Sequence, residues 1–157
     1  MSDDALLKTL GSWGAAELMR VRNRSGLERL PLAAMLSSIL SFHQRTDLDH
    51  LAPSHITLPS GTRAAIDYTG PQPVLAVKLQ ELFGQTETPR IAGGRVPLLC
   101  HLLTPASRPL AVTQDLRSFW VNAYPGLRTQ MKAKYARHVW PEDPLASAPV
   151  KGGRKRR

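Results

Sequence analysis

The chain has 157 residues, of which 42% are hydrophobic and 21% charged, values typical of one globular domain with room for a helical appendage. A formal net charge of +9 suggests a polyanionic partner such as nucleic acid, although a basic protein of an arginine-preferring genome needs no such partner. The single cysteine excludes an internal disulfide, and no apolar run reaches the roughly 18–20 residues that span a bilayer. We therefore expect a cytoplasmic protein with no membrane partner.

The first third of the chain is predicted to be helical. Ser2 is a good N-cap, and acidic residues follow it in the first turn. A longer helix is predicted from Pro31 to Ala52, and its apolar stripe at helical spacing consists of Leu32, Met35, Leu36, Ile39, Leu40 and His43. We place a domain boundary between residues 30 and 31. Residues 1–30 then form a helical segment, which could be the end of a preceding helical region, and residues 31–145 form the main domain.

After Pro53 the hydrophobic period changes from helical spacing to two, which predicts strands. One β-hairpin pairs residues 56–58 with residues 64–68 across a Ser-Gly turn. A second pairs the apolar run Val96 to Leu103, predicted to be a central strand, with a return through Leu110 and Val112. The two hairpins are expected to form a mainly antiparallel sheet of about four strands.

Helices are predicted at residues 74–83, 114–123 and 125–135, where they would cover the sheet. Thr113 is the expected N-cap of the second helix. Trp140 is expected to anchor the segment that follows, and residues 146–157 are predicted to be a disordered basic tail. The predicted fold class is therefore α+β, with N-terminal helices followed by a sheet of two hairpins.

Several catalytic classes find no support in the sequence. There is no G-x-x-x-x-G-K-[ST] phosphate loop and no Cys/His set with zinc spacing. Cys100 and His101 are neighbours on a strand, so their side chains point to opposite faces and cannot form a catalytic pair. We expect no catalytic residue, no metal site and no cofactor site in this chain, which makes an independent enzyme the least favoured hypothesis.

A polar, glycine-rich loop at residues 86–95 is hard to explain by packing alone. Arg90 and Arg95 flank its glycines, so exposed amides and two guanidinium groups could hold a phosphate. The alternative is a structural loop in which these arginines pair with Glu87 or Asp67. The sequence leaves both interpretations open.

A basic run lies on the last predicted helix and its exit, and the chain ends in a second one. Such side chains could follow a nucleic-acid backbone, with Tyr135 and Trp140 stacking on bases. The alternative is a solvated helix face and a solubilising tail. The candidate nucleic-acid-binding residues are Arg128, Lys132, Lys134, Arg137, His138, Arg154, Lys155, Arg156 and Arg157, in addition to the two loop arginines.

Three long stretches carry a resemblance to a known family: LQELFG with TETPR, GGRVPLL with the leucines and prolines that follow it, and HVWPEDP. The chain resembles the C-terminal domain of the HrpB family, which are bacterial ATP-dependent RNA helicases of the DExH type. The resemblance implies that ATP and Mg²⁺ bind upstream domains whose motifs do not occur here. It also implies RNA and those upstream helicase domains as partners.

Two functional hypotheses follow. The first is a non-catalytic accessory domain of an RNA helicase that binds or positions RNA. The second is a protein-interaction module that braces the helicase domains and has no RNA affinity of its own; an exposed apolar patch would favour it.

Overall fold

The computed structural model describes residues 2–153, and these residues divide into two compact units, one ending at Asp49 and the other beginning at His50. The first unit is helical, and the second contains every strand that the structure assigns. The division falls after Asp49, whereas the sequence placed a boundary after residue 30. Packing explains the difference, because the helix that follows Pro31 contacts an earlier helix of the first unit.

Short helices build the first unit: α1 (Asp3–Lys8), α2 (Leu10–Trp13), α3 (Ala15–Leu18), α4 (Arg24–Glu28), α5 (Leu32–Ile39) and the start of α6 (Phe42–Leu51). The helix predicted from Pro31 to Ala52 is interrupted at Leu40, which has extended dihedral angles. A capping box starts the new helix: Ser41 N donates to Gln44 Oε1 at 2.9 Å, and Gln44 N donates to Ser41 Oγ at 3.2 Å. These reciprocal bonds satisfy amides that a continuous helix would otherwise pair.

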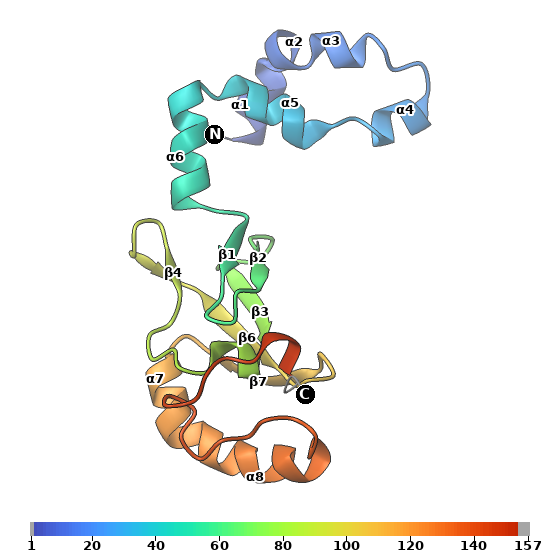
Figure 1. Ribbon diagram of the computed structural model, residues 1–157. Coiled ribbons are helices and arrows are strands. Elements are labelled where there is room, and N and C mark those ends of the chain that lie inside the picture. The colour runs from blue at the N-terminus through green and yellow to red at the C-terminus, as the bar shows by residue number, and fades with distance from the viewer. Residues whose placement is uncertain (1, 154–157) are drawn as a thin grey trace. The chain divides into compact units, whose positions relative to one another are not determined.

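The second unit is built on a five-stranded sheet in the order β1-β2-β3-β6-β7 (Figure 1). Its strands are β1 (His55–Thr57), β2 (Arg63–Asp67), β3 (Val74–Lys78), β6 (Leu99–Leu103) and β7 (Pro109–Thr113). All neighbours are antiparallel except β3 and β6. A separate hairpin consists of β4 (Arg90–Ile91) and β5 (Val96–Pro97). The α+β class and both predicted hairpins are confirmed, although the sheet has five strands.

The helix predicted at residues 74–83 is wrong. The segment forms β3 and then a 3-10 turn, η1 (Leu79–Leu82). Leu75 and Val77 are buried while Ala76 between them is exposed, which is the alternation of a strand. Parallel pairing with β6 supplies the hydrogen bonds that a helix would have made internally. The predicted strand Val96 to Leu103 is also divided, but its second part, β6, is central as expected.

One helical stretch follows the sheet: α7 (Leu116–Ser118), a π-helical turn η2 (Phe119–Ala123) and α8 (Tyr124–Lys134). Asp115, and not Thr113, is the N-cap, because its Oδ1 accepts from Ser118 N at 2.9 Å. The stretch buries Trp120 and Tyr124 against Phe83, with ring centroids 6.1 and 6.3 Å from that of Phe83. This aromatic group holds the start of α8 against Phe83, which follows η1.

The chain beyond α8 returns to the core. Trp140 is buried, and its Nε1 donates to Tyr135 O at 3.1 Å, which confirms the predicted anchor. Residues 144–153, here called the C-terminal strap, then cross η1. Gly84 N donates to Pro144 O and Val150 N to Gln80 O, both at 2.9 Å. Disorder predicted from residue 146 therefore does not describe residues 146–153; the last four predicted tail residues lie outside the described part.

Candidate nucleic-acid interface

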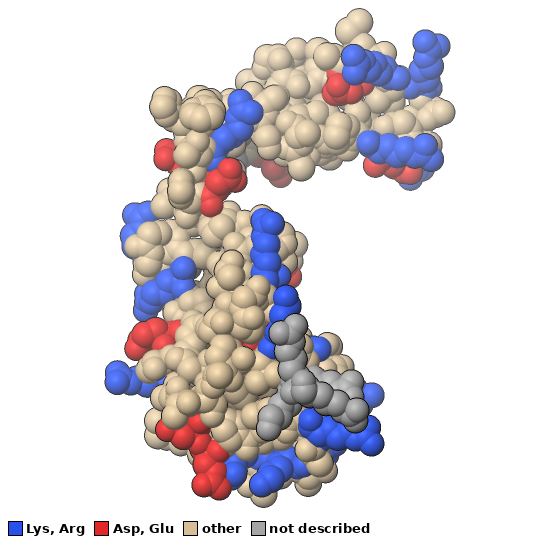
Figure 2. All heavy atoms as spheres, in the orientation of Figure 1, with Lys and Arg blue, Asp and Glu red and all other residues tan. Residues whose placement is uncertain are grey.

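The net positive charge of the chain lies in the second unit. Residues 1–49 contain six basic and six acidic side chains, so the whole net charge of +9 arises from residues 50–157. Figure 2 shows Lys and Arg side chains gathered over α8 at the lower edge of this unit. A polyanion would therefore be attracted to the second unit and not to the first.

The end of α8 carries three exposed members of the predicted set. Lys132 and Lys134 lie in the last turn of the helix, Arg137 follows it, and all three are exposed. Cations are favoured there because the helix dipole places partial negative charge at the C-terminus. We call these three side chains the α8 cluster.

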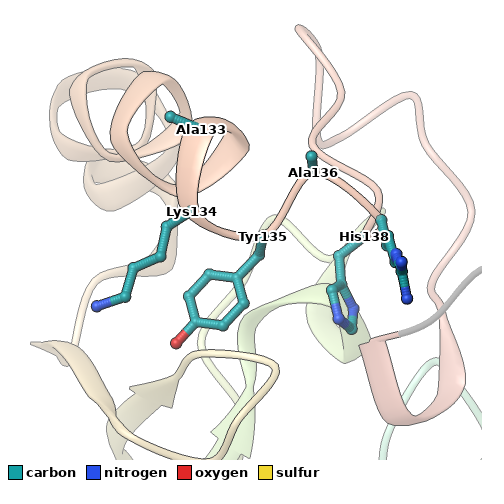
Figure 3. A pocket seen from close by; sticks show the side chains of 6 residues that line it. Ala133, Lys134, Tyr135, Ala136 and His138 are labelled. Carbon is teal, nitrogen blue, oxygen red and sulfur yellow. The ribbon is translucent and has the colours of Figure 1, made fainter.

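A hollow of about 320 Å³ adjoins the α8 cluster and is lined by residues 133–138. Figure 3 shows the side chains of Lys134, Tyr135 and His138 on the same side of the chain. The rings of Tyr135 and His138 are edge to face with centroids 6.1 Å apart, and Lys134 Nζ lies 5.9 Å from the Tyr135 centroid. Half-buried aromatic rings beside cations can stack on a base while the cations contact its phosphate.

Arg128 was predicted to belong to the same basic face, but its guanidinium has internal partners. Its Nε donates to Trp140 O at 3.1 Å, and its NH2 group lies 2.9 Å from Glu142 Oε1. The side chain is 23% exposed. These contacts hold the returning chain against α8, so Arg128 is less available to a ligand than the α8 cluster.

Arg90 and Arg95 lie on the β4–β5 hairpin, which Figure 1 places at the opposite end of the second unit from α8. Arg90 donates to Gly94 O at 3.1 Å and Arg95 to Ala92 O at 2.8 Å. Among residues 2–153, neither arginine pairs with Glu87 or Asp67; each instead binds a carbonyl of its own loop, which is a structural role with other partners than those predicted.

The same hairpin turn already uses most of its amides. Ala92 N donates to Leu51 O, Gly94 N to Ile91 O and Arg95 N to Ala92 O. Ala92, Gly93 and Gly94 all have positive φ, which the two arginine contacts help to hold. A phosphate would therefore meet the outer edges of the guanidinium groups and not a nest of free amides.

Two basic side chains that the sequence analysis passed over border a second hollow, of about 270 Å³, on the sheet. Arg63 on β2 is exposed, and Lys78 at the end of β3 donates from Nζ to Gly152 O at 3.4 Å. The signal for Arg63 was its place on the outward side of an alternating strand. Lys78 was missed because its segment was predicted to be a helix.

Cys100 has the environment of a structural residue. Its side chain is fully buried, and burial raises the pKa of the thiol to about 11. The neutral thiol that this predicts at physiological pH is a poor nucleophile. Across residues 2–153 no three His, Cys, Asp or Glu side chains group together in a way that could hold a metal ion.

No helix of the described chain is both long and apolar enough to cross a bilayer.

Residues 13–144 match the family described as ATP-dependent helicase C-terminal, HrpB_C. The chain is 41% identical over 156 residues to the ATP-dependent RNA helicase HrpB of Escherichia coli K12. The match covers 99% of this chain but only 19% of the relative's length.

Two solved structures of the E. coli protein are similar to this chain. One, described as the DExH-box NTPase HrpB, matches with a TM-score of 0.87 and 42% identity over 95% of this chain and 19% of its own. The other, described as the DEAH/RHA helicase HrpB, matches with a TM-score of 0.70 and 40% identity over 89% and 18%. The fold and these matches define the C-terminal domain of an ATP-dependent helicase.

More particularly, the chain belongs to the HrpB_C family, as its sequence motifs indicated. It spans about a fifth of the length of the relatives it matches.

Proposed function

We propose that this chain is the non-catalytic C-terminal part of an HrpB-type ATP-dependent RNA helicase, and that it binds RNA through the α8 cluster. The observation that carries the proposal is the hollow beside Tyr135, which Lys134 and Arg137 line and which follows the exposed Lys132 on α8. Phosphate contacts from these cations would give affinity without sequence preference. Arg90, Arg95 and the terminal run Arg154–Arg157 stay predicted additional contacts.

In this proposal, ATP and Mg²⁺ are bound by the upstream helicase domains, because the chain offers neither a phosphate loop nor an acid–base pair. The helicase domains are then its protein partners, and a cytoplasmic location stays a prediction. A second candidate role is bracing of those domains without RNA affinity. The apolar side chains exposed on the first unit favour it.

The test is a fluorescence-anisotropy titration of the whole chain against a short labelled single-stranded RNA over a range of salt concentrations. The triple variant Lys132→Glu, Lys134→Glu and Arg137→Glu should abolish binding at physiological salt. Replacing the three cations by neutral residues should reduce the slope of log affinity against log salt by about two.

The matched control is the triple variant Arg22→Glu, Arg29→Glu and Arg45→Glu. All three of these arginines are exposed on the first unit, so the control makes the same change in net charge. It should keep most of the affinity. Equal losses in both triple variants would show a general charge effect and would reject the α8 cluster as the site.

A further inference from the structure

The first unit has almost no core of its own. Met35 is its only buried hydrophobic side chain among the described residues. Met35 packs beside Gly14, and a Cβ atom added at Gly14 would lie 3.5 Å from Met35 Cε. Its helices have four to ten residues, and helices that short are not stable in water without tertiary packing. The stability of this unit must therefore come from contacts beyond those it makes with itself.

An apolar surface is available for such contacts. On α5, Leu32, Leu36 and Ile39 lie on the same face as the buried Met35, at the i, i+4, i+7 spacing of a core-facing stripe, and we call these three side chains the α5 stripe. Leu32 is 54% exposed and Ile39 36%. Met19 and Phe42, also in this unit, are 86% and 75% exposed. Figure 2 shows mainly residues other than Lys, Arg, Asp and Glu over α5.

The charge of the unit argues for a protein partner. Six basic and six acidic side chains cancel within residues 1–49, so a polyanion gains little there. An exposed stripe of aliphatic side chains gains free energy only by leaving water. The eight residues of α5 make about two turns, enough for a ridge of side chains to pack into the groove of a second helix.

From these observations we infer that the α5 stripe is the docking surface for an amphipathic helix of the helicase portion of an HrpB-type protein. The similar proteins carry the equivalent of this chain as 19% of one polypeptide, so four-fifths of each is tethered beside it. Tethering raises the effective concentration of a partner and lets a modest surface remain occupied. The inference rests on the second proposed role, contact with the helicase domains, and does not depend on RNA binding.

The binding test uses the whole chain and, as probe, E. coli HrpB lacking the segment that this chain matches. The chain should bind in a 1:1 complex whose affinity persists at about 0.5 M salt, because apolar burial is not screened. The double variant Leu32→Ser and Ile39→Ser should weaken binding by at least about tenfold. Both side chains are exposed, so the variant should fold as the parent chain does, which far-UV circular dichroism checks.

The control variant is Val112→Ser with Val121→Ser, which removes two exposed valines of the second unit and should leave the affinity unchanged. Hydrogen exchange of the chain alone should be fast at residues 3–49 and slow in β3 and β6, and the probe should slow exchange in α5.

Four results would overturn the inference: no binding, equal affinity of the α5-stripe variant, binding that salt abolishes, or slow exchange at residues 3–49 without the probe. Self-association that the same variant removes would identify a second copy as the occupant instead. The α8-cluster variant should bind the probe normally, so failure of RNA binding and failure of docking are told apart.

Discussion

Tyr124 joins packing and hydrogen bonding at one residue of the second unit. Its ring lies in the aromatic group with Phe83 and Trp120, and its hydroxyl donates to Pro141 O at 2.8 Å. The side chain is 1% exposed, and burial raises its pKa to about 12, against an opposing effect of the Arg128 charge. One phenol therefore links α8 to the chain that returns past Trp140.

This raised pKa predicts a loss of stability in alkali. The folded state binds the phenolic proton more tightly than the unfolded state does. The stabilising contribution of Tyr124 to the free energy of unfolding is therefore fully present below pH 10 and is lost as the pH rises toward 12. The Cys100 thiol adds a similar fall between pH 9 and about 11. The free energy of unfolding from urea titrations should decrease across this range.

The variant Tyr124→Phe should lower the free energy of unfolding by about 1 kcal/mol at neutral pH, because Pro141 O loses its donor. Above pH 10 the difference from the parent chain should shrink, since the variant lacks the titrating group. Every other titratable group is the same in both proteins, so its effect cancels in the comparison. A difference that stays constant up to pH 12 would contradict the assigned cause.

At the scale of elements, local patterns predicted the strands better than the helices. Alternation and a Ser-Gly turn were enough for the β1–β2 hairpin, because the residues that decide it are neighbours in sequence. Leu75, Leu79 and Leu82 fit helical spacing equally well, and only pairing with β6, more than twenty residues away, selects β3. Non-local hydrogen bonds of this kind leave no periodic signal.

The candidate interface was predictable to a similar degree. The sequence identified the basic side chains of α8, and their exposure follows from the polar face of the helix. It could not separate Arg128 from Lys132, because that distinction depends on Trp140 O and Glu142 returning to the helix. The strap was missed for the same reason, since its amides bond to atoms of η1.

The C-terminal strap covers the polar residues of η1. Beneath it lie Gln80, whose side-chain amide atoms are buried without a partner in the described chain, and Glu81, which accepts from Gly152 N at 3.1 Å and from Ser60 Oγ at 3.3 Å. Val150 N caps the carbonyl of Gln80. A buried amide without a partner lowers stability, so the backbone hydrogen bonds and the burial of apolar neighbours must hold the segment.

Deleting residues 145–157 should therefore lower the midpoint of thermal unfolding by several degrees. The deletion removes the hydrogen bonds that Val150 N and Gly152 N donate to Gln80 and Glu81, and it uncovers η1. Deleting only residues 154–157 should leave the midpoint unchanged, and this shorter deletion is the proper control for RNA binding by the tail. Scanning calorimetry of both variants checks the prediction. Equal midpoints in all three proteins would show that the strap is not part of the folded unit.

At the scale of the whole molecule, net charge is segregated between the two units. The second unit holds the net positive charge and the hollow beside Tyr135, while the first has no net charge and partly exposes the α5 stripe. Two partners of different chemistry follow from this segregation. Polyanion binding should depend steeply on salt, and apolar docking should not.

Hydrogen exchange in the presence of RNA tests this segregation directly. Single-stranded RNA at low salt should slow exchange at residues 132–138, because the bound backbone and stacked base order the end of α8. Residues 3–49 should exchange as they do without RNA, since no net charge attracts a polyanion to them. The α8-cluster variant should lose the protection, and raising the salt concentration should remove it from the parent chain. Protection within residues 3–49 would mean that local arginines, and not the net charge of a unit, select the RNA surface.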